Sequence, residues 1–399
     1  MTVTAPATTA GHAPTPPLLT LGAPRLLAAT TPEVPPRDRA WLVHAATDVR
    51  LLGRGGAAFP VARKLAAVPL GGRVLVNGGE GEPASFKDRA LMRHQPDLVV
   101  AGIRLVAGAL GSSAAPVVAV EDEPSAHALA AAAHRAGARL DVRLTHHGFV
   151  GGEVGALVNG LSGRAPRPNG RRVLPHDRGL DDAPTYASNV ETFAQLALLS
   201  AMGPAGYASV GPAHEPGTSL VTVLGDAPAA GVVEVPHGVA LRDLLGTDTL
   251  PVLVGGYHGA WAVPHGAVVG RADMRERGLG WGAGVLAVLP EDTCPVAEVA
   301  RVTDWLARAS AGQCGPCVFG LRAIADDLLA LARGEAVDHE RLRTRLGLTR
   351  GRGACHHPTG AVGFVASALG VFADDVSAHV HGSGCGRPDR GALPTGGAR

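Results

Sequence analysis

The chain has 399 residues and a formal net charge of +1, so it is long enough for two or three domains and carries no large excess of charge. This balance argues against nucleic acid as a partner, and no apolar run is long enough to insert directly into a membrane. Residues 1–36 are rich in Thr, Ala and Pro but lack the basic start and apolar core of a signal peptide. We therefore expect a disordered N-terminus and a cytoplasmic protein.

Residues 37–205 alternate between short apolar runs and longer helical patterns. Strands that alternate with helices favour a mostly parallel sheet covered on both faces, and hence an α/β domain. The glycines that close the helical segments are typical C-terminal caps. The predicted strands are 73–79, 116–122 and 139–145, and the predicted helices are 96–111 and 124–137.

Two further blocks follow. Residues 216–290 contain a strand–turn–strand pattern at 219–238 and a short helix at 240–246, which is typical of a small β-grasp-like insert. Residues 295–381 are helical and predict a four-helix bundle, and residues 382–399 form a Gly/Pro-rich tail that we expect to be loose. The four predicted bundle segments are 295–310, 319–334, 338–347 and 360–380.

The chain has five cysteines, and an odd number argues against a framework of disulfides. Cys314 and Cys317 are three residues apart at the start of a predicted helix, so both thiols project to the same side. Thiolates are ligands for iron–sulfur clusters and for zinc. The alternative is that the cysteines are free thiols packed as small apolar groups.

Two loops have the composition of ligand-binding loops. In 53-GRGGAAFPVARK-64, adjacent glycines expose backbone N–H groups that suit a phosphate, and Arg54 and Lys64 add positive charge. The stretch 77-NGGEGEPASFKDRALMRHQPD-97 directly follows a predicted strand, where α/β sheets bind ligands. Taken singly, each loop is equally compatible with an ordinary surface turn.

Taken together with 148-GFVGGEVGAL-157, 184-PTYASNVETF-193 and CGPC in the helical block, these loops resemble the NADH- and FMN-binding subunit of respiratory complex I. Related subunits of NAD-linked hydrogenases and formate dehydrogenases belong to the same family. The resemblance covers residues 51–385 with the motifs in the family's order. It implies an FMN-binding Rossmann-like domain, an SLBB or ubiquitin-like insert, and a helical iron–sulfur domain.

The resemblance also implies a set of cofactor-binding residues. The glycine loop and a ribityl-binding pair would hold FMN, while two glutamates would lie near the nicotinamide nucleotide. The FMN residues implied are Gly53, Arg54, Gly55, Gly56, Ala57, Lys64, Asn77 and Glu80; the nucleotide residues are Glu82 and Glu153; Ser188 and Asn189 match the family's paired asparagines.

Several positions depart from the family pattern. Ala58 stands where a glycine is usual, Gly79 where an aspartate is usual, and Val154 where a second glutamate is usual. Leu174 falls by spacing at the position of the aromatic residue that stacks on the adenine. The loss of one aromatic contact weakens binding by about tenfold at most, because such a contact contributes about 0.5–1.5 kcal/mol.

For the cluster, the resemblance implies that Cys314, Cys317 and Cys355 are three of four ligands of a 4Fe–4S cluster, with Ala311 in place of the first cysteine. The fourth position could belong to Cys294, to His356 or His357, or to water, or the cluster could be of the 3Fe–4S type. A zinc site on the same thiols is a further alternative. Cys385 matches no cluster position.

The resulting hypothesis is an NADH dehydrogenase-like electron-transfer subunit. It would oxidise NAD(P)H through FMN and pass electrons to an iron–sulfur cluster, and then to other redox subunits or a ferredoxin-like acceptor. The protein would be cytoplasmic or peripheral to a membrane redox complex. The alternative is an NADH-independent relay, or a degenerate scaffold subunit of such a complex. A quinone or polysaccharide site on the small β block would rest on fold analogy alone.

Overall fold

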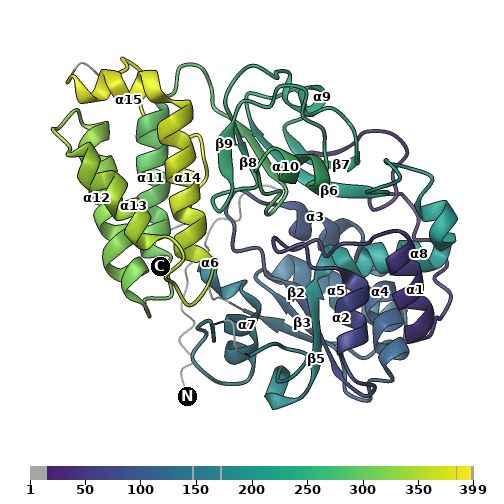
Figure 1. Ribbon diagram of the computed structural model, residues 1–399. Helices are drawn as coiled ribbons and strands as arrows, with labels where there is room; N and C mark the ends of the chain where they lie inside the picture. Colours follow the sequence, from purple (N-terminus) through teal and green to yellow (C-terminus); the bar gives the residue numbers. More distant parts are fainter. Residues whose placement is uncertain (1–15, 146–147, 171–172, 383, 397–399) are drawn as a thin grey trace, which may run out of the picture.

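The computed structural model describes residues 16–145, 148–170, 173–382 and 384–396. These residues form two sheets with their helices and a separate helical region to one side (Figure 1). The first sheet comes from the N-terminal half of the chain, and the helical region comes from the C-terminal quarter. The second sheet comes from the middle of the chain, with one added strand from near the N-terminus.

The first sheet is parallel, with strand order β4-β3-β2-β5. Its strands are β2 (Arg73–Gly78), β3 (Val117–Val120), β4 (Asp141–Leu144) and β5 (Thr185–Asn189). The three strands predicted from apolar runs are confirmed, with ends that differ by fewer than three residues. The predicted mixed α/β class with a parallel sheet is also confirmed. β5 was not predicted as a strand, because TYASN lacks an apolar run.

Helices cover both faces of this sheet, because successive side chains along a buried strand point to opposite sides. Val74 and Val76 face the main apolar core, while Leu75 and Ala119 face a smaller one that includes Leu157 of α7. The helices of this region are α1 (Arg39–Asp48), α2 (Val61–Ala67), α3 (Lys87–His94), α4 (Pro96–Leu110), α5 (Glu123–Arg135), α6 (Gly148–Gly151), α7 (Val154–Leu161), the 3-10 turn η1 (Leu180–Asp182) and α8 (Val190–Tyr207).

The second sheet is mixed, with strand order β1-β7-β6-β10-β8-β9. β6 and β7 form the predicted antiparallel hairpin, and β10 lies parallel to β6. The elements are β1 (Leu18–Thr20), β6 (Thr218–Gly225), β7 (Gly231–Pro236), α9 (Leu241–Leu245), β8 (Val252–Val254), β9 (Ala260–Ala262), α10 (Arg271–Glu276) and β10 (Val285–Val288).

The expectation of a disordered N-terminus is corrected for residues 16–36. β1 pairs parallel with β7, and the backbone N–H groups of Arg25, Leu26 and Leu27 donate to the buried carboxylate of Glu234. A carboxylate that accepts several backbone N–H groups is well compensated for burial. A single short strand with little apolar periodicity left no signal for this in the sequence.

The helical region begins at α11 (Pro295–Arg308) and continues through a π-helix, η2 (Pro316–Leu321), into α12 (Arg322–Ala332), α13 (His339–Thr349), α14 (His357–Val371) and α15 (Ala373–Val380). The segment expected as one helix at 360–380 breaks at Phe372, where α14 and α15 meet at 83°. Among the described residues no single helix is long and apolar enough to cross a membrane, and only this bent pair would meet that criterion when its two helices are taken together.

The segment after Gly382 was expected to be loose, but residues 388–396 lie along α11. Glu298 accepts hydrogen bonds from the backbone N–H groups of Ala392 at 2.7 Å and Leu393 at 3.2 Å. The indole of Trp305 donates to the carbonyl of Gly396 at 2.9 Å. A Gly/Pro-rich composition predicts poor regular structure, yet it does not prevent such side chain–backbone contacts.

Candidate flavin and iron–sulfur site

The first candidate site lies at the carboxyl edge of the parallel sheet, between β2 and β5. From β2 the chain continues outward to β3 and β4, and it later returns to place β5 on the other side of β2. Open α/β sheets bind ligands at this kind of topological switch point. Asn77 of β2 and Asn189 of β5 are paired directly across it, and Ser188 precedes Asn189 on the same strand.

The glycine loop lies against this edge. An added Cβ on Gly55 would lie 3.7 Å from the Cβ of Asn189, and the backbone N–H of Arg54 donates to the hydroxyl of Thr192 at 2.9 Å. Among the described residues, none accepts a hydrogen bond from the N–H groups of Gly55, Gly56 or Ala57. Consecutive N–H donors of this kind suit an anion such as a phosphate.

The same loop contains backbone strain that the family's usual residue would avoid. Ala58 has φ of +47°, a left-handed conformation that glycine adopts without steric cost. The loop therefore holds an alanine in a conformation that carries a steric cost. The N–H groups of Gly53 and Ala58 bond to the carbonyls of Phe59 and Gly55 at 3.0 and 3.1 Å, which closes the turn.

The two cations of the loop point in different directions. Lys64 donates to the carbonyl of Ala187 at 2.9 Å, one residue before Ser188, and burial lowers its pKa. Arg54 instead extends towards the second sheet, where its guanidinium donates to Ser219 at 3.0 Å and to the carbonyl of Thr218 at 3.1 Å. The backbone of Arg54 therefore belongs to the glycine loop, while its side chain forms hydrogen bonds with the second sheet.

A buried network of charged side chains holds the side chain of Asn189 in place. Lys87 lies 2.7 Å from Asp88 and 3.0 Å from Glu191, and the amide of Asn189 donates to Asp88 at 2.7 Å. Burial opposes the charge on Lys87, but the two carboxylates outweigh it and raise its pKa. Burial also opposes ionisation of Glu191, but Lys87 and Arg54 outweigh it and lower its pKa. These charges fix the side chain of Asn189 at the strand end.

The acidic loop contributes two glutamates in different surroundings. Glu80 accepts hydrogen bonds from Ser85 at 2.5 Å, from the backbone N–H of Asp88 at 3.1 Å and from the Nε of Arg89 at 3.0 Å, so its carboxylate is engaged within its own loop. Glu82 reaches the second sheet and accepts from the backbone N–H of Tyr257 at 2.9 Å. Burial raises the pKa of Glu82 to about 7, against the hydrogen bonds from Tyr257 and Ala84.

Glycines allow the loops around Glu82 to approach closely. A Cβ on Gly81 would lie 2.9 Å from the carbonyl of Gly148, and one on Gly256 would lie 2.6 Å from a carboxylate oxygen of Glu82. The amide of Asn77 donates to the carbonyl of Gly152 at 2.9 Å. Residues 148–152 and the turn at Gly256 thus enclose the acidic loop. The sequence around Gly256 has no recognisable motif that would predict this contact.

Glu153 lies at the N-cap of α7, close to one of the cysteines. Its carboxylate caps α7 by accepting from the backbone N–H of Ala156 at 2.9 Å. It is also close enough to Cys355 to raise that thiol's pKa, although burial contributes more to the increase. The structure therefore brings Glu153 and Cys355 together from segments about 200 residues apart in the chain.

Cys314, Cys317 and Cys355 form one group. Burial raises the pKa of Cys317 to about 12, and the neighbouring Cys314 and Cys355 add to the increase. Thiols that oppose each other's ionisation in this way are converted to thiolates by metal binding. Cys317 is carried by η2, Cys314 lies just before it, and Cys355 lies just before α14. Three soft ligands at this place fit an iron–sulfur cluster.

Two of the suggested fourth ligands are placed unfavourably. Cys294 precedes α11 and Cys314 follows it, so a helix of 14 residues, roughly 20 Å long, separates them. The two ring nitrogens of His357 are 3.0 Å from the ring of His258 and 2.9 Å from the carbonyl of Leu306. Neither residue is therefore free to approach the three thiols.

Two family models match separate parts of the chain, one on the side of the glycine loop and one on the side of the cysteines. Residues 46–198 match the Nuo51 FMN-binding domain, and residues 297–379 match the NADH-ubiquinone oxidoreductase-F iron-sulfur binding region. The F subunit of the NADH-quinone oxidoreductase of Streptomyces coelicolor is 30% identical over 379 residues, covering 86% of this chain and 84% of that protein. The corresponding protein of Mycobacterium tuberculosis is 29% identical over 391 residues, covering 88% of this chain and 86% of that protein.

A solved structure shows the same architecture. The air-oxidised NAD+-reducing NiFe-hydrogenase contains a chain with a TM-score of 0.82 and 28% identity, and the match covers 92% of this chain and 68% of that one. The chain belongs to the family of NADH-quinone oxidoreductase F subunits, and it is an NADH-oxidising electron-transfer protein that uses FMN and an iron–sulfur cluster.

Proposed function

We propose a specific division of labour among the residues of this protein. FMN lies at the carboxyl edge of β2 and β5, NADH enters over the acidic loop, and the cluster is held by Cys314, Cys317 and Cys355. A separate redox subunit receives the electrons. When bound, FMN would supply a hydride acceptor for NADH that can release electrons singly, and the cluster would supply a one-electron carrier to that subunit.

For FMN, the proposal rests on the free N–H groups of the glycine loop and on the paired asparagine positions. Gly55, Gly56 and Ala57 would donate to the phosphate, and Asn77 and Asn189 would bond the ribityl chain and ring. Lys64, which donates to the carbonyl of Ala187, would balance part of the negative charge of the phosphate. The buried network around Lys87 keeps Asn189 in position before FMN binds.

For NADH, the proposal assigns Glu82 and Glu153 to the nucleotide. Glu82 accepts backbone N–H groups from Tyr257 and Ala84, and Glu153 accepts one from Ala156, which fixes the orientation of both carboxylates. The pKa of about 7 makes Glu82 a group that is partly protonated at neutral pH, so it can both donate to and accept from a ribose hydroxyl. No side chain needs to act as an acid or base, because the hydride passes directly between nucleotide and flavin.

The cluster would have three protein thiolates and one position without cysteine, because Ala311 stands there. A ligand from outside the chain, such as water, would complete the set at that position. The π-helix that carries Cys317 also exposes Phe319 with 76% of its surface accessible and Val318 with 43%. Exposed apolar side chains beside a redox centre favour this face as the docking site of a partner redox subunit or ferredoxin-like acceptor.

We also propose finer domain assignments. The central parallel pair of β6 and β10, flanked by β7 on one side and by β8 and β9 on the other, supports a β-grasp-like (SLBB) unit. The packing of α11, α12, α13 and α14 supports a helical iron–sulfur domain of bundle type. Arg54 and Glu82 are among the side chains whose hydrogen bonds join the β-grasp-like unit to the flavin domain.

The observation that supports the proposal is the proximity of Glu153 to Cys355, because it would bring the proposed nucleotide site close to the proposed cluster thiols. The test is anaerobic purification, reconstitution with FMN, iron and sulfide, and a visible spectrum before and after NADH. We expect flavin bands and a broad sulfur-to-iron shoulder that both bleach with NADH. Flavin that bleaches with dithionite but stays oxidised with NADH would contradict the dehydrogenase assignment.

The alternative function is an NADH-independent relay, and the replacements at Gly79, Val154 and Leu174 favour it. Leu174 is 48% exposed, so it presents an aliphatic surface where an aromatic residue is usual. The same spectra separate the two functions, because a relay would keep both cofactors and fail only with NADH as the donor.

A further inference from the structure

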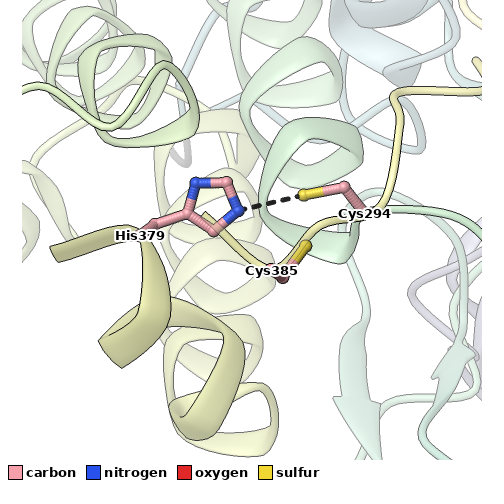
Figure 2. Close-up of side chains that lie close together, drawn as sticks. All are labelled: Cys294, His379 and Cys385. Carbon is pink, nitrogen blue, oxygen red and sulfur yellow. Dashed lines mark hydrogen bonds between the residues drawn. The ribbon is translucent and has the colours of Figure 1, made fainter. Parts of the chain in front are cut away.

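A second group of metal-ligating side chains lies at the other end of α11. Cys294, His379 and Cys385 place one sulfur or nitrogen atom each within 4.8 Å of one another (Figure 2). Cys294 Sγ is 3.3 Å from His379 Nε2. These residues come from three separate elements, namely the N-cap of α11, the last turn of α15 and the C-terminal segment.

The histidine is oriented as a ligand. Its Nδ1 lies 3.2 Å from the carbonyl of Leu331, so the ring donates its N–H there. In that tautomer, assigned from the hydrogen-bond partners, Nε2 carries a lone pair and faces the two sulfurs. Metal-binding histidines typically donate their second ring nitrogen to a backbone carbonyl in this way.

The group is buried where a single ion would be held. Cys294 and His379 are almost fully buried, and Cys385 is partly exposed. The group is therefore largely shielded from solvent and is open only on the side of Cys385.

We propose that Cys294, His379 and Cys385 bind one Zn²⁺ ion, separate from the iron–sulfur ligands, with water as the fourth ligand on the partly exposed side of Cys385. Two thiolates and one imidazole form a donor set that zinc prefers. In tetrahedral zinc sites with bonds of about 2.3 Å to sulfur and about 2.0 Å to nitrogen, ligand atoms lie roughly 3.6 Å apart. The group needs only small movements to reach that geometry.

The ion would fasten the C-terminal segment to the helical region. The N–H of Cys294 already donates to the carbonyl of Pro388 at 2.9 Å, and Arg387 forms an ion pair with Asp375 of α15. Zinc would add three bonds across the same junction, one each to α11, α15 and residues 384–396. Its role is therefore structural, and it makes no direct contribution to electron transfer.

The first experiment measures zinc and iron per chain in the full-length protein, purified anaerobically and supplied with zinc, FMN, iron and sulfide. We expect about one zinc per chain, with X-ray absorption at the zinc edge showing two sulfur and two lighter ligands. Cys385→Ser and His379→Gln should each lower the zinc content at least about tenfold and leave iron unchanged. Cys317→Ser is the matched control and should lose iron but keep zinc.

Three results would overturn the proposal. The first is zinc that is absent from the wild type, and the second is zinc retained equally by Cys385→Ser. The third is a disulfide between Cys294 and Cys385 in protein kept anaerobic, detected by mass spectrometry, because it would assign the pair to redox chemistry.

A second measurement does not depend on the zinc content. Trypsin cuts after Arg390, which lies in the segment that the ion would hold, and the side chain of Arg390 is 53% exposed. Added zinc should slow this cleavage about tenfold in the wild type and not in Cys385→Ser. Equal protection of both proteins would contradict the structural role, even if zinc binds.

Discussion

The two ends of α11 contain cysteines in different surroundings. At its C-terminal end, Cys314, Cys317 and Cys355 form a group close to Glu153. This group is called wide because it is not among the described groups whose ligand atoms lie within 4.8 Å of one another. At its N-terminal end, Cys294 and Cys385 form a compact group with His379. The wide group suits a cluster of several atoms, and the compact group suits one ion. Cysteine count alone would not separate these two sites.

The largest effect is expected at the wide group. Cys317→Ser removes a ligand from a cluster that already lacks one cysteine, so the iron content should fall to less than about a tenth. Bleaching of FMN by NADH should persist, while electron delivery to a one-electron acceptor should fall at least about 100-fold. Iron retained in Cys317→Ser would contradict the assignment of these thiols.

The second prediction concerns the C-terminal segment at the compact group. Glu298 is fully buried and accepts two backbone N–H groups of that segment, at 2.7 and 3.2 Å. Glu298→Gln should lower the free energy of unfolding by about 2–4 kcal/mol, because the charged acceptor is lost inside the protein. Glu340→Gln, at an exposed position of α13 in the same helical region, is the control and should change it by less than about 0.5 kcal/mol.

Denaturant unfolding measures this difference. The trypsin assay should also show faster cleavage after Arg390 in Glu298→Gln. A change no larger than that of the control would mean that the segment is not held by Glu298.

The third prediction uses the pH dependence of the flavin side. The pKa of Glu82 is raised to about 7 from an ordinary value near 4.5, so the folded state holds a proton that the unfolded state releases. Its contribution to stability is present below pH 4.5 and is lost as the pH rises to 7. Glu82→Gln should therefore remove most of this decline, measured as the urea midpoint at pH 5 and pH 8. An unchanged decline would show that other groups cause it.

The smallest effect is expected at Leu174, on the nucleotide side. Leu174→Tyr restores an aromatic surface and should lower the KM for NADH by about twofold to tenfold, which corresponds to about 0.5–1.5 kcal/mol. Leu250→Tyr, at another exposed leucine in the second sheet region, is the matched control and should leave KM unchanged. Equal KM values in Leu174→Tyr and the wild type would mean that the adenine does not reach this position.

Sequence reasoning found the parallel sheet because buried strands there are continuous runs such as RVLVNG and VVAV. It missed β5, because the side chains of TYASN are buried by their place in the sheet rather than by an apolar pattern. Motif spacing predicts Cys314 and Cys317 as ligands, because both lie at the start of one helix. The compact group had no such signal, because Cys294, His379 and Cys385 meet only after α15 turns away from α14.

The contrast between local signals and long-range contacts also holds for the glycine loop. The glycine loop is recognisable because backbone N–H donation needs small residues next to each other. The side chain of Arg54 was expected to add charge to that loop, whereas it extends to Ser219 and Thr218. Side-chain direction depends on the neighbouring sheet, so residue spacing could not predict it.

The most direct test of the account is electron paramagnetic resonance of reconstituted protein, frozen after addition of NADH. The account predicts a reduced iron–sulfur signal in the wild type and in Cys385→Ser, and none in Cys317→Ser. A signal that is lost in Cys385→Ser, or kept in Cys317→Ser, would contradict the separation of electron transfer at one end of α11 from structural metal binding at the other.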